Sequence, residues 1–315
     1  MIKIKVFCSV LIFSSGCTSV PMGPTCVSDI GIDVRTETTI IQVNSSETVG
    51  WDYLLGEIDT ASVILLGELH DHAIGHAVQL AVVEDVMDKY PGSALALEML
   101  ERDEQFRVDD YMEDLIDAKT FASITQSKSW GGEGGWEAWY QPIIDAAKDR
   151  GGRVVAANAP RRYVRLARTD GYERIDALPD ERRAFVDYPK ELSGGRYRQR
   201  FWEFADHGEN GIEEEIDVTT IDPDDPMLPT FKSMQAWDAT MAQSVIDASP
   251  STEKKVVLMV GQFHVEYDGG IVQELRNRMP EVNVIVISIQ KEMPDEDWQK
   301  EPRIADIMVV ENAND

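Results

Sequence analysis

Short, continuously apolar runs alternate along the chain with longer segments of helical periodicity. The runs are typical of strands covered on both faces, and they span residues 62–66, 94–97, 153–157, 255–260, 282–289 and 307–310. Between them, the spacing of apolar positions predicts helices over 74–90, 139–150, 233–249 and 270–278. Strands that alternate with helices predict an α/β fold, in which a mostly parallel sheet is flanked by helices.

One stretch interrupts this alternation. Residues 160–232 contain several charged and aromatic helical segments and no convincing strand, so they predict a smaller helical subdomain inserted between two strands. Its Asp- and Pro-rich run, 222–229, is typical of a returning loop. We therefore predict one α/β domain that is made of 51–159 and 233–315. Residues 17–50 precede it as a tether with a first short strand near 39–43.

The N-terminus has the order of a secretory signal. Lys3 and Lys5 precede a mostly apolar stretch, 6–13, and small residues then lead into Cys17. The stretch is too short to span a bilayer, which needs about 20 apolar residues. A cysteine directly after a small-residue cleavage site is what lipoprotein processing modifies, and several acyl chains anchor a protein firmly. We predict a signal peptide over 1–16 and lipidation of Cys17; the alternative is an ordinary signal peptide with Cys17 incidental.

The predicted anchor implies a place in the cell envelope. Thr18 follows the cysteine where an aspartate would signal retention in the inner membrane, which favours the outer membrane. Cys8 lies in the predicted signal, so Cys26 is the one cysteine left for the folded part. A single thiol cannot form an internal disulfide, and the fold must therefore depend on its hydrophobic core.

The charge limits the partners. The formal net charge is −27 at pH 7, and loss of residues 1–16, with two lysines and no acid, makes it −29. A surface this acidic repels nucleic acid phosphates and anionic lipid headgroups. We expect no nucleic acid partner, and membrane association only through the lipid anchor.

Residues that could bind a ligand or take part in catalysis stand where the strands are expected to end. In open parallel sheets, ligands bind at the carboxyl ends of the strands. Two Gly-x-x-His segments, Gly67–His70 and Gly261–His264, stand at such positions, as do Glu98 and Asn158. Glycine lets the backbone turn sharply as it leaves the sheet, so an imidazole three residues later can point back over the strand ends. The placement therefore predicts that both histidines share one crevice with Glu68 and Glu98.

Two imidazoles and two carboxylates allow metal or acid–base chemistry. His70, His264 and Glu68 can ligate a divalent ion such as zinc or manganese, and Glu68 or Glu98 can act as the catalytic group that activates water. The alternative is that each histidine only ties down its own loop by a backbone hydrogen bond.

Two more histidines, His72 and His76, extend this cluster. Asp71 is expected to cap the following helix, which places His76 and Gln79 on one side near its start. The alternative, stronger for His72, is that both histidines are solvated polar positions on a helix whose opposite face is apolar.

Two further features suit a flat, acidic ligand. Glycines and tryptophans mix in the loop 130–136, and Trp139 and Tyr140 follow it, so that flat rings can stack on a planar ligand or pack on the core. Arg161 and Arg162 begin the densest basic patch of the chain and can pair with ligand carboxylates. The alternative pairs these arginines with local Asp and Glu side chains.

Taken in order, these motifs resemble the ChaN-like haem-binding uptake lipoproteins. That family belongs to the Tiki/TraB group, which is related to the erythromycin esterases. The matching landmarks cover nearly all of residues 60–290 and are 66–71 with His76 and Gln79, 96–99, 136–140, 157–160, Gln235, 237–238, 241–242 and 261–264. The chain departs from the family at Gly75, where relatives often carry a second histidine.

The resemblance implies a parallel-sheet domain with a smaller helical domain, and a surface lipoprotein that binds haem for iron acquisition. Haem needs one or two axial ligands, flat apolar walls and cations for its propionates. The residues expected to contact it are His70, His72, His76, Tyr140, Arg161, Arg162 and His264.

Three functions follow, in this order of preference. The resemblance favours a haem-binding protein without enzymatic activity. The residues alone slightly favour a metal-dependent hydrolase, because carboxylates stand beside the histidines and haem binding has no evident use for them. The resemblance to the Tiki proteins, which use two Gly-x-x-His motifs for metal-dependent hydrolysis, implies the same alternative. A surface interaction module ranks third. The sequence leaves open whether two chains form a homodimer, and which haem receptor or transporter would take the ligand.

Overall fold

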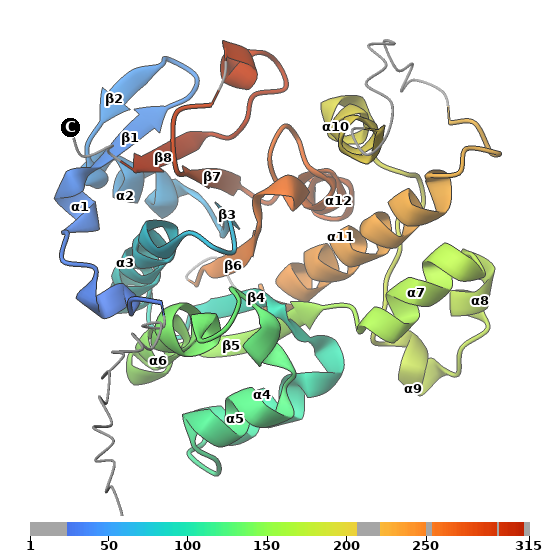
Figure 1. The fold of residues 1–315 in the computed structure, drawn as a ribbon, viewed down its shortest axis with the longest axis horizontal. Coiled ribbons are helices and arrows are strands. Elements are labelled where there is room, and N and C mark those ends of the chain that lie inside the picture. Colours follow the sequence, from blue (N-terminus) through green and yellow to red (C-terminus); the bar gives the residue numbers. More distant parts are fainter. Residues whose placement is uncertain (1–23, 207–220, 250–253, 295, 312–315) are drawn as a thin grey trace, which may run out of the picture.

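The computed structural model describes residues 24–206, 221–249, 254–294 and 296–311 (Figure 1). The predicted signal peptide, Cys17 and the start of the predicted tether lie outside the described residues. Within the described part, no helix has the length and apolarity needed to cross a membrane.

Eight strands form one sheet in the order β2-β1-β8-β7-β3-β6-β4-β5. Their bounds are β1 Thr38–Gln42, β2 Glu47–Val49, β3 Val63–Glu68, β4 Ala94–Glu101, β5 Arg153–Asn158, β6 Val256–Gly261, β7 Val284–Gln290 and β8 Ile307–Glu311. The six strands from β8 to β5 are parallel, whereas β1 pairs antiparallel with both β2 and β8. This mostly parallel sheet confirms the predicted fold class. Strand β1 matches the first short strand predicted near 39–43, and its antiparallel partner β2 is an addition.

Helices cover both faces of the sheet, which explains why the strands are continuously apolar. Their bounds are α1 Val34–Glu37, α2 Trp51–Thr60, α3 Ala73–Lys89, α4 Gln105–Met112, α5 Ala118–Ile124, α6 Gln141–Asp149, α7 Arg161–Thr169, α8 Tyr172–Asp176, α9 Asp180–Arg183, α10 Gly195–Asp206, α11 Leu228–Ala248 and α12 Gly270–Arg278. Ile64 and Leu66 of β3 pack in the core with α2, α3 and α6, whereas Leu65 packs with α11 and α12. Every residue of β3 and of β6 is buried.

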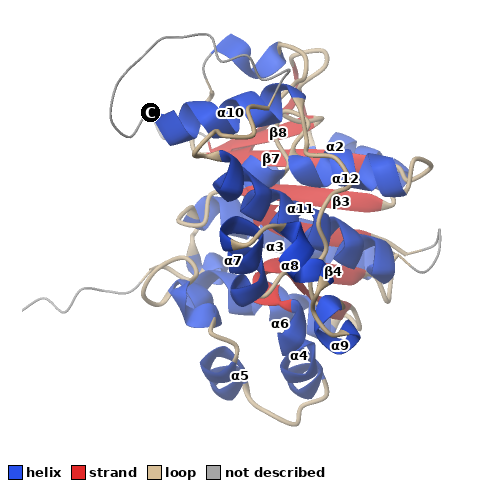
Figure 2. Cartoon of the chain, turned by 90° about the vertical axis from the view of Figure 1, so that its right-hand side faces the viewer, coloured by secondary structure: helices blue, strands red, loops and turns tan. Residues whose placement is uncertain are grey.

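Between β5 and β6 the chain leaves the sheet and forms α7, α8, α9 and α10 before α11 returns (Figure 2). The described part of 160–232 contains no strand. Helix α11 links this region to the sheet, because Phe231 and Ala236 pack in the small cores of the inserted helices while Met241 and Val245 pack against the sheet. The boundaries at 159/160 and 232/233 stay predictions, and α11 begins at Leu228, before the second of them.

The predicted cap of α3 is wrong. The residue before the first helical turn is His72, and no side chain caps this helix. Asp71 instead forms an exposed ion pair with Lys291, at 3.0 Å from carboxylate to ammonium. The chain therefore turns one residue later than predicted, and His72 is buried at the helix start.

Candidate functional site

The two Gly-x-x-His segments leave neighbouring strands. Glu68 at the end of β3 lies opposite Gly261 at the end of β6, so the two segments are offset by one residue in register. Each glycine makes room for the other segment. A Cβ on Gly67 would lie 3.0 Å from Val265 Cγ2, and a Cβ on Gly261 would lie 3.2 Å from His70 Nε2. Side chains larger than hydrogen at these positions would push the two turns apart.

Glu68 is the buried centre of the first half of the site. Its Oε1 accepts hydrogen bonds from the Tyr140 hydroxyl and lies 2.7 Å from His70 Nδ1, and its Oε2 accepts a bond from Gln79 Nε2 at 2.6 Å. Burial by itself would raise the pKa of Glu68. The nearby His76 charge and the hydrogen bonds from His70 and Tyr140 outweigh burial and lower this pKa to about 2. Glu68 is therefore a carboxylate at neutral pH.

His76 is fully buried behind this carboxylate. Its Nδ1 lies 2.8 Å from Gln79 Oε1, and its Nε2 lies 3.2 Å from the His70 carbonyl oxygen. Because Gln79 gives its amide N–H to Glu68, both ring nitrogens of His76 face acceptors. Both contacts are hydrogen bonds only when the ring carries two protons. Glu68 Oε2, 3.9 Å from His76 Nδ1, then supplies the opposite charge.

His264 forms the second half of the site with Asp238 of α11. Asp238 Oδ1 lies 2.6 Å from His264 Nδ1, and Asp238 Oδ2 accepts bonds from Tyr197 of α10 and Gln235 of α11. Burial disfavours the charged ring, but Asp238 and Glu98 outweigh burial and raise the pKa of His264 to about 9. The ring is therefore an imidazolium at neutral pH.

Glu98 at the end of β4 joins the two halves. Its Oε2 accepts a 2.6 Å hydrogen bond from the Gly261 amide, and its Oε1 lies 3.7 Å from His264 Nε2. Asn158 at the end of β5 donates to the Glu98 carbonyl, which holds this strand end in place. The structure thus brings His70, Glu68, Glu98 and His264 together as the Gly-x-x-His spacing predicts.

His70 is the member of the cluster that reaches the surface. Its side chain is 37% exposed, compared with 9% for His264. The edge of the His70 ring meets Trp130, with ring centroids 4.8 Å apart, and the Arg161 guanidinium lies 5.6 Å above the Trp130 ring. Burial lowers the pKa of His70, but the Glu68 hydrogen bond and the charges of Glu68 and Glu98 outweigh burial and raise it. We refer to His70, Trp130 and Arg161 as the His70 surface.

The structure places other predicted ligand residues away from this surface. Tyr140 is fully buried, its hydroxyl is held by Glu68, and burial with the Glu68 charge raises its pKa far above the usual range. His76 is enclosed by Trp139 and Tyr140. His72 turns toward β8, where its Nε2 lies 3.0 Å from Glu311 Oε2. The idea that His72 and His76 are solvated is wrong, because both are buried.

Gly75 lies directly against His72, and Arg161 and Arg162 differ in their acidic partners. A Cβ on Gly75 would lie 2.7 Å from His72 Nδ1, so a histidine at this position would require His72 to move. Arg162 pairs with Asp103, which matches the alternative of local ion pairs. Arg161 lies 4.0 Å from Glu101 and stays mostly exposed, so its charge is available to a ligand.

The site offers little internal space. The hollow at the ends of β4 and β5, next to Trp130, has a volume of about 10 Å³, which is room for one water molecule. A flat molecule the size of haem is far larger than this hollow. Among the described residues, no group of three or more His, Cys, Asp or Glu side chains is placed to hold a metal ion.

Sequence reasoning missed the role of Asp238. Gln235 and Asp238 stand three residues apart, and therefore on one face, in the middle of a largely apolar and buried helix; the buried Thr240 and Ser244 lie on the other side of it. Polar residues on such a face need buried partners. The three-residue spacing of Gln235 and Asp238 could therefore have indicated a buried polar contact. It could not identify His264 as the partner of Asp238, because that pairing depends on the fold.

Comparison with known proteins agrees with this geometry. The family model described as "Haem-binding uptake, Tiki superfamily, ChaN" matches residues 54–275. Among solved structures, ChaN of Campylobacter jejuni, determined with cofacially bound haem, superposes with a TM-score of 0.63. It shares 17% identity over 88% of this chain and 98% of that one. An erythromycin esterase superposes with a TM-score of 0.42 and 12% identity, over 81% of this chain and 76% of that one.

A curated plant protein is also similar. Protein RETICULATA-RELATED 5 of Arabidopsis thaliana, a chloroplastic protein, is 21% identical over 253 residues, which are 77% of this chain. The chain spans about a third, 32%, of that relative's length. Because the family model covers most of the chain, including both Gly-x-x-His segments and Asp238, the chain belongs to the ChaN family of haem-binding uptake proteins in the Tiki superfamily.

Proposed function

We propose that this chain binds haem on the outside of the strand ends, with His70 as an axial ligand to the iron. The observation that carries the proposal is the state of the His70 ring. Its Nδ1 is held by Glu68 at 2.7 Å, which leaves Nε2, on the side of the ring toward Gly261, as the nitrogen for a ligand, and the side chain as a whole is 37% exposed. A carboxylate on the far nitrogen fixes the ring and increases its basicity, as is usual for metal-bound histidines.

The surroundings of His70 suit the rest of the haem. Trp130 offers a flat apolar ring beside the histidine, and Arg161 above it offers an exposed cation for a propionate. The hollow beside Trp130 and Arg161 is too small for a porphyrin, which favours binding against the surface. Haem would supply iron as the cargo, while the chain supplies an oriented imidazole and a counter-charge. The cofacial haem binding of ChaN from Campylobacter jejuni supports an open site of this kind.

The cellular role follows from the N-terminus. The order of positive, apolar and small residues before Cys17 supports a lipoprotein in the cell envelope, anchored in the outer membrane. A haem-binding lipoprotein there would serve iron acquisition by passing haem to a receptor or transporter. Labelling of whole cells with a radioactive fatty acid tests the anchor, because Cys17→Ser removes the label if Cys17 carries the lipid.

Removal of the His70 imidazole is expected to weaken haem binding at least about tenfold. Titration of the purified apoprotein with hemin, followed by the Soret band, measures this for His70→Ala. His72→Ala is the matched control, because that ring faces Glu311 on β8 and should leave the affinity unchanged. Equal affinities for wild type and His70→Ala would end the proposal.

Because the raised pKa of His70 makes protons compete with iron, the affinity for haem should also increase as the pH rises above this pKa.

A second candidate function is hydrolysis. The observation in its favour is the buried His264–Asp238 pair, in which His264 Nε2 points toward Glu98, since an imidazolium that a carboxylate orients can act as a general acid. Metal analysis of the purified protein, combined with ester hydrolysis assays with and without added zinc or manganese, tests this candidate. Hydrolysis that His264→Gln abolishes would support it, and no hydrolysis under any of these conditions would rule it out.

A further inference from the structure

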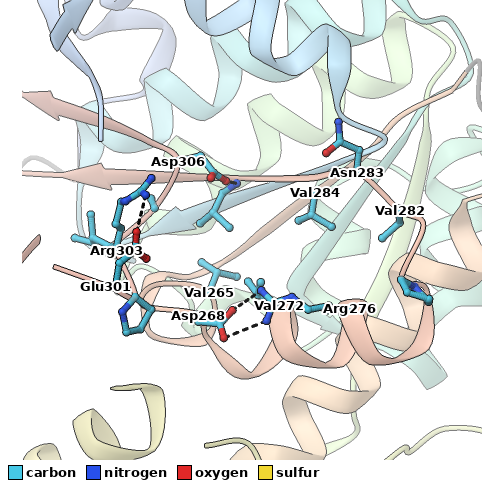
Figure 3. A pocket seen from close by; sticks show the side chains of 15 residues that line it. Val265, Asp268, Val272, Arg276, Val282, Asn283, Val284, Glu301, Arg303 and Asp306 are labelled. Atoms are coloured by element: carbon cyan, nitrogen blue, oxygen red, sulfur yellow. Dashed lines mark hydrogen bonds and ion pairs between the residues drawn. The ribbon is translucent and has the colours of Figure 1, made fainter. Parts of the chain in front are cut away.

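A second pocket lies away from the His70 surface. It has a volume of about 670 Å³ and is bounded by α12, by the beginning of β7 and by the loop 301–306 that leads into β8 (Figure 3). This volume is in the range of small-molecule sites. None of the residues that line the pocket belongs to the His70 surface. From this pocket we propose that the chain binds a small amphipathic cation, namely an amine or quaternary ammonium that carries an apolar group.

Apolar side chains form one part of the pocket lining. Val272 of α12, Val284 and Val286 of β7, and Val265 and Ile304 from the adjoining loops line it. Val265, Val286 and Ile304 also belong to the core on this face of the sheet. Those three side chains are buried, whereas Val272, Val282 and Val284 are only partly buried, so apolar ligand surface placed against these valines would be removed from water.

The charged side chains in the pocket favour a positively charged ligand. Arg276 donates to both carboxylate oxygens of Asp268, and Arg303 pairs with Glu301. Figure 3 shows the Arg276–Asp268 pair and Asp306 on opposite sides of the pocket. Asp306 has no ion-pair partner within 4.0 Å among the described residues; its Oδ2 accepts one bond, from the Val286 amide at 2.8 Å. The charge left without a partner is therefore a carboxylate.

The environment of Asp306 makes a cation the fitting partner. Asp306 is an exposed residue of the lining, so its carboxylate is open to a ligand; partial burial raises the pKa of this carboxyl, although the charge of Arg303 acts in the opposite direction. An ammonium group within contact distance would pair with the carboxylate while its alkyl part covers the neighbouring valines. An anion would have to displace Asp268 or Glu301 from its arginine, in a chain whose net charge is −27. A neutral apolar ligand would leave the carboxylate uncompensated.

Hexylammonium, hexanoate and hexanol separate these possibilities, because they share one chain length and differ in charge. The readout is the thermal midpoint of the full chain, which a ligand of the native state raises in a concentration-dependent way. We expect hexylammonium to raise it at concentrations up to ~10 mM, and hexanol and hexanoate to have at least about tenfold weaker effects. Hexanoate as effective as hexylammonium, or no shift with any probe, would overturn the proposal.

Two variants test the location. Asp306→Asn keeps an oxygen for the Val286 amide but removes the charge. Val272→Phe fills the space next to the valines of the pocket and keeps the charge. Each should weaken the response to hexylammonium at least about tenfold, whereas Asp247→Asn, on the exposed side of α11, should not change it. An unchanged response in Asp306→Asn would contradict the proposal. These outcomes do not depend on haem binding.

Discussion

Replacement of Asp238 by alanine is expected to lower the free energy of unfolding at pH 6 by about 3–5 kcal/mol. The carboxylate is 1% exposed and has three partners in contact, namely His264, Tyr197 and Gln235. Its removal leaves an imidazolium, a hydroxyl and an amide buried without their acceptor. Chemical denaturation of wild type and Asp238→Ala measures the difference.

The pH dependence distinguishes this loss from a simple packing defect. The folded-state pKa of His264 is raised to about 9, so the pair contributes its full stability below the unfolded value of about 6.5. That contribution is lost as the pH rises through 9, and the gap between the two proteins should narrow accordingly. Asp247→Ala on the exposed side of α11 is the matched control, with an expected change under about 0.5 kcal/mol. A gap that is constant from pH 6 to pH 9 would contradict the assignment.

Replacement of Arg200 by methionine should cost a similar amount at pH 7, about 3–5 kcal/mol, because it leaves Glu266 buried and uncompensated. Glu266 is 1% exposed, and its Oε2 lies 3.2 Å from the Arg200 guanidinium of α10. Its other oxygen accepts bonds from Ser288 and Gln290 of β7, which cannot supply a charge.

The sign of the pH effect is opposite for this variant. Burial raises the pKa of Glu266 even with Arg200 present, and loss of the arginine raises it further. The folded variant therefore takes up a proton as the pH falls from 7 toward the unfolded value near ~4.5, and its deficit relative to wild type should shrink. Arg196→Met, on the same helix and paired with the partly exposed Glu203, should cost under about 1 kcal/mol. Unfolding curves that show a deficit growing toward low pH would refute this account.

The sheet could be predicted from sequence because its central strands are buried on both faces. Such strands are apolar along most of their length, as β3 and β6 show; in β7 the buried Ser288 and Gln290 interrupt this pattern and donate hydrogen bonds to Glu266. The strand β2 escaped prediction because it has only three residues, Glu47–Val49, none of them buried. Helix α2 was not predicted either, although Trp51, Leu54 and Ile58 stand at helical spacing. It precedes the first long apolar run, and the prediction considered only helices between such runs.

The candidate site was predictable only in part. The repeated Gly-x-x-His spacing, placed at strand exits, is enough to bring His70 and His264 together with Glu68 and Glu98. That spacing does not indicate which of the side chains near the site are exposed. His76 and Tyr140 lie near His70 in sequence or in space, yet both are sealed by neighbouring aromatic rings, and only tertiary packing decides this. Asp238 belongs to a helix that reaches the site across the inserted region, so its pairing required the fold.

The position of iron tests the central claim most directly. Crystals of the hemin complex, measured at the iron absorption edge, give an anomalous difference peak that marks the metal without assumptions about the porphyrin. We expect this peak at bonding distance, about 2.0–2.1 Å, from Nε2 of His70, with Nδ1 still held by Glu68. An iron peak bound through His72 near β8, or beside Asp306 in the α12 pocket, with no density at His70, would contradict the account.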